Sequence, residues 1–274
     1  MKIETWLTPN AAGESERSPA SVAIVIDVLR ATTVATTALS AGAKSITTCG
    51  TVEEAFSMKS EASSDNVPLL CGERGCQPIV GFDFGNSPGE YSPAGVGERE
   101  LILTTTNGTA AILAAEQCEH MWLACFANLS AVIDRLVRWH TANIDTANKD
   151  NDSAFARIVC AGTNGCVTAE DVLLAGAIIA MCHQRLADSP RFYDGPIDLL
   201  NDSGAIALSA WQHCITHDGV NSSETLAERL TLTQGGKNLI AANYANDLVD
   251  CGSIDVFDLV PTRDQRSPAR FVAG

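Results

Sequence analysis

Short apolar runs alternate with longer Ala- and Leu-rich stretches along most of the chain. The run SVAIVI at residues 21–26 is typical of a buried strand, and the stretch that follows it is typical of a helix. Repetition of this pattern predicts a layered α/β/α fold with a largely parallel or mixed central sheet. The predicted strands cover residues 21–26, 45–49, 67–71, 101–104, 121–125 and 157–160.

The helices predicted between these strands begin and end at typical capping residues. Thr51-Val52-Glu53-Glu54 has the spacing of a capping box, and Gly42 can end the preceding helix. A weak alternation at 253–259 predicts a last, edge strand. The predicted helices cover residues 31–41, 51–61, 109–117, 130–139, 168–186, 203–216, 224–230 and 234–243.

A polar segment at 140–154 interrupts the pattern and is interpreted as a surface insertion. We therefore expect a single catalytic α/β domain over residues 1–274, divided at most into two lobes, 1–139 and 155–274. The longest nearly apolar run, 172–182, has 11 residues. Because a bilayer needs about 20, this run is predicted to be a core helix.

The charge balance limits the choice of partners. The chain has 18 Lys and Arg against 33 Asp and Glu, a net charge of −15. Such a surface repels a phosphate backbone, so nucleic acid is excluded as a partner, and we expect no membrane association. The N-terminal sequence has no apolar signal segment, and the ten cysteines form no C-x-x-C pair. We expect free thiols and a cytoplasmic protein, with a homodimer as a possible assembly.

Ligands of open α/β sheets bind beyond the carboxyl ends of the strands, and the first such junction is rich in polar groups. Asp27 follows a predicted strand, Arg30 comes three residues later, and Thr32 and Thr33 open a helix. Asp27 could hold a metal ion or act as a base, while Arg30 could bind an oxyanion. In the alternative interpretation Asp27 only caps the helix and pairs with Arg30.

The second junction opens a glycine-rich loop that runs from residue 72 to residue 90. Glu73, Asp83 and Glu90 could supply oxygen ligands to a hard cation, and Arg74 could clamp a phosphate. Asn86 and Ser87, further along the loop, are candidate substrate contacts. A surface loop with solvated charges is the alternative.

Two further junctions carry small hydrogen-bonding residues before a helix. Thr105, Thr106, Asn107 and Gly108 could form an anion cradle, although such residues also cap ordinary helices. After the strand at 157–160, Gly162 precedes the acidic pair Glu170-Asp171. These carboxylates could lie near a metal, or could simply interact favourably with the helix dipole.

Several standard catalytic signatures are absent from the sequence. It contains no G-x-x-x-x-G-K-[ST], no G-x-G-x-x-G and no G-x-S-x-G. No D-x-D follows an apolar run, and no Cys is followed by Arg at the spacing of a phosphocysteine loop. The common NTPase and phosphatase scaffolds are therefore excluded.

Together, these segments resemble one family, the 2-phosphosulfolactate phosphatases of coenzyme M biosynthesis. They occur in family order and span about residues 22 to 185, whereas the C-terminal third matches only loosely. The matching segments are VAIVIDVLRATT at 22–33, GERG at 72–75, GFDFGNSP at 81–88, LTTTNGT at 103–109, CFAN ending at Asn128, and IVCAG at 158–162 followed by Glu170-Asp171.

The resemblance implies a magnesium-dependent phosphatase that hydrolyses 2-phospho-3-sulfolactate, or a related small phosphorylated acid, to sulfolactate and phosphate. Whether water or a carboxylate such as Asp27 attacks phosphorus stays open. A non-catalytic binder of small anionic metabolites is the alternative function. The expected catalytic residues are Asp27, Arg30, Glu73 and Arg74; the expected Mg²⁺ ligands are Asp27, Glu73, Asp83 and Asp171; and the expected substrate contacts are Thr32, Thr33, Asn86, Ser87, Thr105, Thr106, Asn107, Gly108, Asn128 and Gly162.

Overall fold

The computed structural model describes residues 1–10, 20–64, 66–146, 154–188 and 197–274. The strands are β1 (Lys2–Trp6), β2 (Val22–Ile26), β3 (Ser45–Thr48), β4 (Leu69–Arg74), β5 (Gln77–Pro78), β6 (Glu100–Thr104), β7 (His120–Ala124), β8 (Ala156–Cys160), β9 (Asp198–Leu199), β10 (Thr262–Gln265) and β11 (Arg270–Val272). The helices are α1 (Ala31–Ser40), α2 (Val52–Glu61), α3 (Pro93–Val96), α4 (Gly108–Ala114), α5 (Leu129–Thr146), α6 (Ala169–Ala187), α7 (Asp202–Thr216), α8 (Ser223–Thr231), α9 (Gln234–Ala241) and α10 (Asp247–Cys251), with short 3₁₀ turns at Pro88–Glu90 and Phe126–Asn128.

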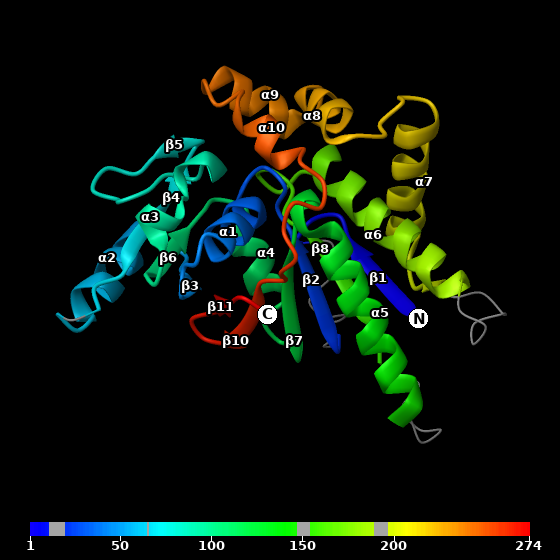
Figure 1. The fold of residues 1–274 in the computed structure, drawn as a ribbon, viewed down its shortest axis with the longest axis horizontal. Helices are drawn as coiled ribbons and strands as arrows, with labels where there is room; N and C mark the ends of the chain where they lie inside the picture. Colours follow the sequence, from blue (N-terminus) through cyan, green and yellow to red (C-terminus); the bar gives the residue numbers. More distant parts are fainter. Residues whose placement is uncertain (11–19, 65, 147–153, 189–196) are drawn as a thin grey trace.

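The described strands form one mixed sheet in the order β5-β4-β6-β3-β11-β10-β7-β2-β8-β1-β9 (Figure 1). Two groups of parallel strands make up most of it, β4-β6-β3 and β7-β2-β8-β1. The antiparallel hairpin of β10 and β11 joins the two groups. In this hairpin Phe271 pairs with Ile46 of β3, and Thr262 pairs with Trp122 of β7. The predicted α/β fold with a mixed sheet is confirmed.

Strand β2 lies at the centre of one parallel group, and all five of its residues are fully buried. Successive side chains of a strand point to opposite faces. Ile24 accordingly packs with residues of α5, α6 and α7, while Val25 packs with residues of α1 and α4. Helices thus cover both faces of the sheet, as a continuously apolar strand requires. No described helix is long and apolar enough to cross a membrane.

The local pattern predicted most elements, and the differences have physical causes. The edge strand predicted at 253–259 is wrong: that segment is irregular, and its Asp255 and Phe257 amides donate to Phe126 and Ala127 carbonyls. The strands instead come afterwards, at β10 and β11. At Thr51 the predicted capping box is half present, because Thr51 accepts from the Glu54 amide whereas the Glu54 carboxylate reaches the Gly50 amide.

The polar segment at 140–154 is not wholly irregular. Helix α5 continues to Thr146, so the first part of that segment is helical. Residues 147–153 lie outside the described part of the chain. Strand β1 was not predicted, because its Lys2 and Glu4 make the run look polar, yet its Ile3 is fully buried.

Candidate active site

The loops that follow β2, β4, β6 and β8 meet at one place. Glu73, near the end of β4, accepts hydrogen bonds at Oε1 from the amide and the hydroxyl of Thr106, each at 2.9 Å. Asp171, at the start of α6, accepts from the Val28 amide and from the Gly162 amide, both at 2.9 Å. Segments far apart in the sequence therefore build one site.

Four buried carboxyl groups gather in this site. Asp27, Glu73, Glu170 and Asp171 are each at most 7% exposed. Burial raises the pKa of Asp27 to about 7, an effect that its Ala31 hydrogen bond opposes and the nearby charges of Glu73 and Glu170 reinforce. Burial also raises the pKa of Glu170 and of Asp171, and the Asp27 charge adds to the rise at Asp171. A cation bound beside Asp27, Glu170 and Asp171 would favour their ionised forms.

Two of the four carboxylates are already saturated with hydrogen bonds. Both oxygens of Asp171 accept from backbone amides, and Oε2 of Glu73 accepts from the Cys76 amide at 2.7 Å. From the described residues the Asp27 carboxyl group, by contrast, accepts a single hydrogen bond, of 3.3 Å, from the Ala31 amide to Oδ1. Within the described residues, Glu170 Oε2 is buried without any hydrogen-bond partner. Asp27 and Glu170 are thus the acids with free oxygens.

The donor set of this site fits a hard divalent cation. No three His, Cys, Asp or Glu side chains of the described residues form a ready-made metal cage. Mg²⁺, however, is usually held by one or two carboxylates, with waters and substrate phosphate completing its coordination. A buried carboxylate oxygen without a partner, as at Glu170, is the kind of group that such an ion satisfies.

The segment after β6 approaches Asp27 very closely. A Cβ atom at Gly108 would lie 2.5 Å from Ala31 Cβ and 2.8 Å from Asp27 Oδ2, so only glycine fits there. The neighbouring Asn107 accepts a hydrogen bond from the Asn164 amide, which ties this segment to the loop after β8. The structure therefore brings the predicted anion cradle to the acid cluster.

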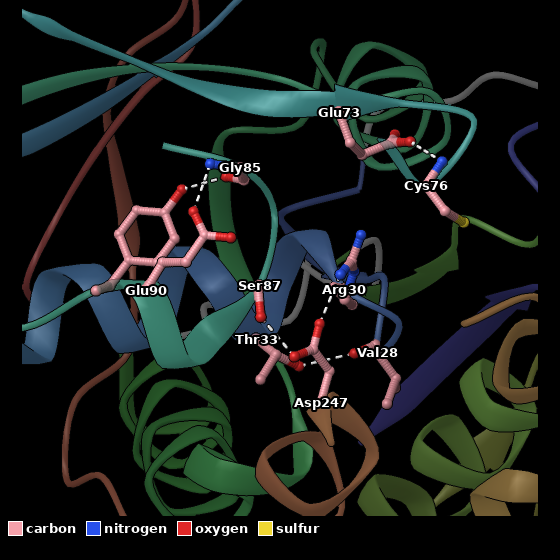
Figure 2. A network of polar contacts seen from close by, with 10 residues as sticks. Val28, Arg30, Thr33, Glu73, Cys76, Gly85, Ser87, Glu90 and Asp247 are labelled. Carbon is pink, nitrogen blue, oxygen red and sulfur yellow. Dashed lines mark hydrogen bonds and ion pairs between the residues drawn. The ribbon is translucent and has the colours of Figure 1, made fainter. Parts of the chain in front are cut away.

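Arg30 enters the same site from the other side. Its Nη1 donates to Asp247 Oδ2 at 2.5 Å, and its guanidinium carbon lies 4.5 Å from the ring centre of Tyr244. Figure 2 shows one end of the guanidinium at Asp247 and the other pointing to the side where Glu73 and Cys76 lie. Arg30 is only 3% exposed, and its charge acts on Asp27.

Arg74 and Asp83 occupy different surroundings. Arg74 follows Glu73 in a strand, so the two side chains point to opposite faces. Its guanidinium donates to the Gly50 carbonyl and to Thr104 Oγ1. Asp83 Oδ2 accepts from Lys59 and from the Leu70 amide. These contacts place Arg74, expected as a phosphate clamp, and Asp83, expected as a metal ligand, apart from the acid cluster.

Several predicted substrate contacts brace the loops instead. Thr32 donates to the Asp27 and Ala124 carbonyls, and Thr33 donates to the Val28 carbonyl. Asn128 is fully buried; its Oδ1 accepts from the Cys125 amide, and its Nδ2 donates to two carbonyls. These groups have their hydrogen bonds within the protein, which argues for support of the site rather than contact with a ligand.

Asn86 and Ser87 also lie buried beside the site. Ser87 Oγ donates to Asp247 Oδ1 at 2.5 Å. In the described part of the chain, Asn86 Oδ1 is buried and accepts no hydrogen bond. Ser87 therefore belongs to the surroundings of Arg30, through Asp247.

Two residues of the site, Tyr244 and Asp247, were missing from the sequence-based candidates. Glu170 was considered there with Asp171 as a carboxylate that could lie near a metal, but only Asp171 was kept among the expected ligands. Asp247 and Tyr244 had no signal in the sequence, because Asp247 meets Arg30 across a sequence separation of 217 residues. Both come from the C-terminal helices α8, α9 and α10 and the turns between them, which lie together at one end of the molecule (Figure 1).

A cleft of about 520 Å³ opens beside the acid cluster. Thr106 and Asn107 form part of its wall, so the cleft reaches the residues that contact Glu73. None of the four acids lines the cleft itself, which also includes residues of α4 such as Ala110 and Leu113. Other lining residues are Asn10, Ala161, Asn164 and Gly165.

Comparison with known proteins agrees with the resemblance noted in the sequence. The sequence model of the 2-phosphosulpholactate phosphatase family matches residues 6–266. A probable 2-phosphosulfolactate phosphatase of Caldanaerobacter subterraneus subsp. tengcongensis is 34% identical over 261 residues, 95% of either chain. A protein of the same description from Thermotoga maritima is 35% identical over 239 residues, 87% of either chain.

These matches extend beyond the motifs into the C-terminal third, where Tyr244 and Asp247 lie. A probable 2-phosphosulfolactate phosphatase of Deinococcus radiodurans is 43% identical over a shorter stretch of 160 residues, 57% of this chain and 60% of its own. The chain therefore belongs to the 2-phosphosulfolactate phosphatase family, a family of phosphoric monoester hydrolases.

Proposed function

We propose that the protein is a magnesium-dependent phosphatase that hydrolyses 2-phospho-3-sulfolactate, or a closely related small phosphorylated sulfo or carboxy acid, to the hydroxy acid and phosphate. The observation that carries the proposal is the buried carboxylate cluster beside Arg30, in which Glu170 Oε2 has no partner among the described residues. Family membership supports the choice of substrate.

The residues of the site have distinct tasks in this reaction. Asp27 and Glu170 would hold Mg²⁺, and Arg30 would bind phosphate oxygens. When bound, the metal neutralises phosphate charge and polarises a phosphoryl oxygen. Asp171 and Glu73 keep the loops in place through their backbone hydrogen bonds. Phosphoryl transfer depends mainly on such positioning and on charge stabilisation.

Hydrolysis breaks the bond between phosphorus and the ester oxygen and forms one to an oxygen that comes from water. Gly108 keeps the space at Asp27 Oδ2 clear of any side chain of its own. From there Asp27 can accept a proton from the attacking water, or attack phosphorus itself before water releases the phosphate. Both routes use the same atom. A single turnover quenched in acid distinguishes them, because only the second route leaves phosphate covalently bound to the Asp27 carboxylate.

A non-catalytic binder of small anions is the second candidate function. The buried acids disfavour it, because carboxylates repel an anion unless a cation lies between them. A pure binding site would need donors and cations, whereas this site holds four buried carboxyl groups and Arg30 is paired with a fifth, Asp247.

Phosphate release from 2-phospho-3-sulfolactate tests the proposal directly. The purified protein should release phosphate with Mg²⁺, stop in EDTA, and recover when Mg²⁺ is added back. Rates of phosphate release from phospholactate and phosphoglycerate, measured in parallel, show how much the sulfonate group contributes to substrate specificity. Undiminished turnover in EDTA would remove the metal from the mechanism, and binding without release would favour the anion binder.

We also propose that the enzyme works in the cytoplasm. All ten cysteines are free in the structure, and most are buried. Thiols persist in reducing compartments, which supports this location. Fractionation of source cells tests it, and recovery outside the cytoplasm would contradict it.

A further inference from the structure

We propose that Asp247 and Tyr244 are positioning residues that hold the guanidinium of Arg30 in the orientation needed to bind phosphate. The inference rests on the proposed function, since it assumes that Arg30 contacts phosphate. It assigns to the turn between α9 and α10 a task in a site whose charged groups otherwise come from β4, α6 and the loop after β2.

The contacts of Arg30 constrain its guanidinium in two ways. Asp247 binds one terminal nitrogen at 2.5 Å, and the Tyr244 ring lies 4.5 Å from the guanidinium carbon. A carboxylate fixes the direction of an N–H bond, and an aromatic face fixes the plane of the cation. Together they leave little freedom to a side chain that is otherwise long and flexible.

The same contacts leave part of the guanidinium free for a ligand. Nη1 donates to Asp247, while Nη2 and Nε of Arg30 have no protein acceptor among the described residues. Arginine recognises phosphate through two parallel N–H bonds. One nitrogen is thus used for anchoring, and the remaining two can form such a pair.

Asp247 also prevents Arg30 from forming an ion pair with the carboxylates of the acid cluster. Asp27 lies near enough for the Arg30 charge to act on it, yet the ion pair forms with Asp247. Without Asp247, the acid cluster would attract the guanidinium and Arg30 would neutralise Asp27 instead of binding phosphate. Asp247 therefore keeps the cation and the free acids apart.

Asp247 is itself firmly anchored. It is 4% exposed, its Oδ1 accepts from Ser87 Oγ, and its amide donates to the Tyr244 carbonyl at 3.1 Å. Figure 2 shows Ser87 and Arg30 on the two oxygens of this carboxylate. The two positioning residues are thus linked to each other and to the glycine-rich loop.

A double-mutant cycle on phosphate binding tests the inference. The dissociation constant of inorganic phosphate would be measured by calorimetry with Mg²⁺ for the wild type, Arg30→Lys, Asp247→Asn and the double variant. If Asp247 acts through Arg30, each single change should weaken binding about tenfold, and the double variant should be no more than about twofold weaker than Arg30→Lys. KM should rise with the phosphate dissociation constant, while kcat changes less.

Two further variants separate positioning from stability. Asp247→Glu keeps the carboxylate and should recover most of the affinity that Asp247→Asn loses. Asp250→Asn, one turn further along α10, is the matched control and should leave phosphate binding unchanged. Should Asp247→Asn fail to fold, Tyr244→Leu takes its place in the cycle, with an expected loss of about threefold that disappears in the Arg30→Lys background.

Additive losses in the cycle, or a lower melting temperature with unchanged phosphate affinity, would overturn the inference. A wild-type protein that does not bind phosphate would overturn it as well. The proposed function fails separately: a protein that binds phosphate through Arg30 and Asp247 but releases none from any phospho acid would contradict the phosphatase and leave the positioning intact.

Discussion

The strand-end loops and the C-terminal helices contribute different things to the same site. The loops after β2 and β4 and the start of α6 supply the ionisable groups, such as Asp27 and Glu170. The C-terminal helices add contacts that fix those groups: Asp247 on Arg30, and Gly235 against Glu170. The strand-end loops therefore provide the reactive groups, and the C-terminal helices hold these groups in position.

The strand-end loops and the C-terminal helices also differ in their electrostatic interactions. Carboxyl groups crowded at the sheet edge raise one another's pKa, so the loops carry an unfavourable electrostatic interaction. The C-terminal helices instead form favourable contacts, for example the buried ion pair of Arg30 with Asp247. Substitutions in the strand-end loops and in the C-terminal helices should therefore affect activity and stability in different proportions. Three experiments test this.

The largest effect is expected at Asp27. Asp27→Asn removes a free carboxylate and should lower kcat/KM by about 100-fold or more, roughly 3 kcal/mol, without lowering the melting temperature. Asp171→Asn is the matched change at a saturated acid. It leaves one backbone amide facing an NH₂ group and should cost about 1–3 kcal/mol of stability. Kinetics and thermal unfolding on the same preparations check both. A loss of stability at Asp27 as large as that at Asp171 would show that Asp27 serves the fold rather than the reaction.

A smaller effect is expected in the C-terminal helices. A Cβ at Gly235 would lie 2.0 Å from Glu170 Oε1, so Gly235→Ala must displace either α9 or the carboxylate. We expect kcat/KM to fall about tenfold through Glu170, with a modest loss of stability. Gly89→Ala is the control, because its Cβ would meet its nearest neighbour at an ordinary 3.5 Å. Unchanged kinetics in Gly235→Ala would show that α9 does not fix Glu170.

The last effect concerns stability rather than activity: in metal-free protein the free energy of unfolding should depend on pH. The folded state keeps a proton on Asp27 up to about pH 7, whereas the unfolded chain loses it near the ordinary pKa of 3.8. Between these values the folded state binds more protons, so the free energy of unfolding should fall as pH rises, by at most about 1.4 kcal/mol per unit for this group.

Thermal unfolding in EDTA from pH 4 to pH 8 measures this slope. Asp27→Asn should flatten it without abolishing it, because the pKa values of Glu170 and Asp171 are raised too. Mg²⁺ should reduce the slope in the wild type, since it favours the ionised carboxylates. Identical slopes in the wild type and the variant would mean that the fold does not raise the Asp27 pKa.

The pattern of apolar and polar residues predicted the features of the site that depend on neighbours in the sequence. The apolar run of β2 and the polar turn after it placed Asp27 and Arg30 at a strand end, and the structure has them there. The same reasoning grouped Arg74 with Arg30, although strand alternation sends Arg74 away from Glu73 toward Gly50. Asp247 could not be found, since no local signal marks a carboxylate whose partner is 217 residues away. The sequence thus predicted which loops form the site. Which of their side chains contact one another depends on tertiary packing, which the sequence pattern does not show.

The β10–β11 hairpin has a consequence for how the protein is made. Residues 262–272 follow all other described strands in the sequence, yet they occupy the middle of the sheet, between β3 and β7. During synthesis both parallel groups must wait with an unpaired inner edge until these residues leave the ribosome. Exposed strand edges invite pairing with other chains. The interval before the hairpin closes is therefore when a nascent chain is most open to aggregation and most in need of a chaperone.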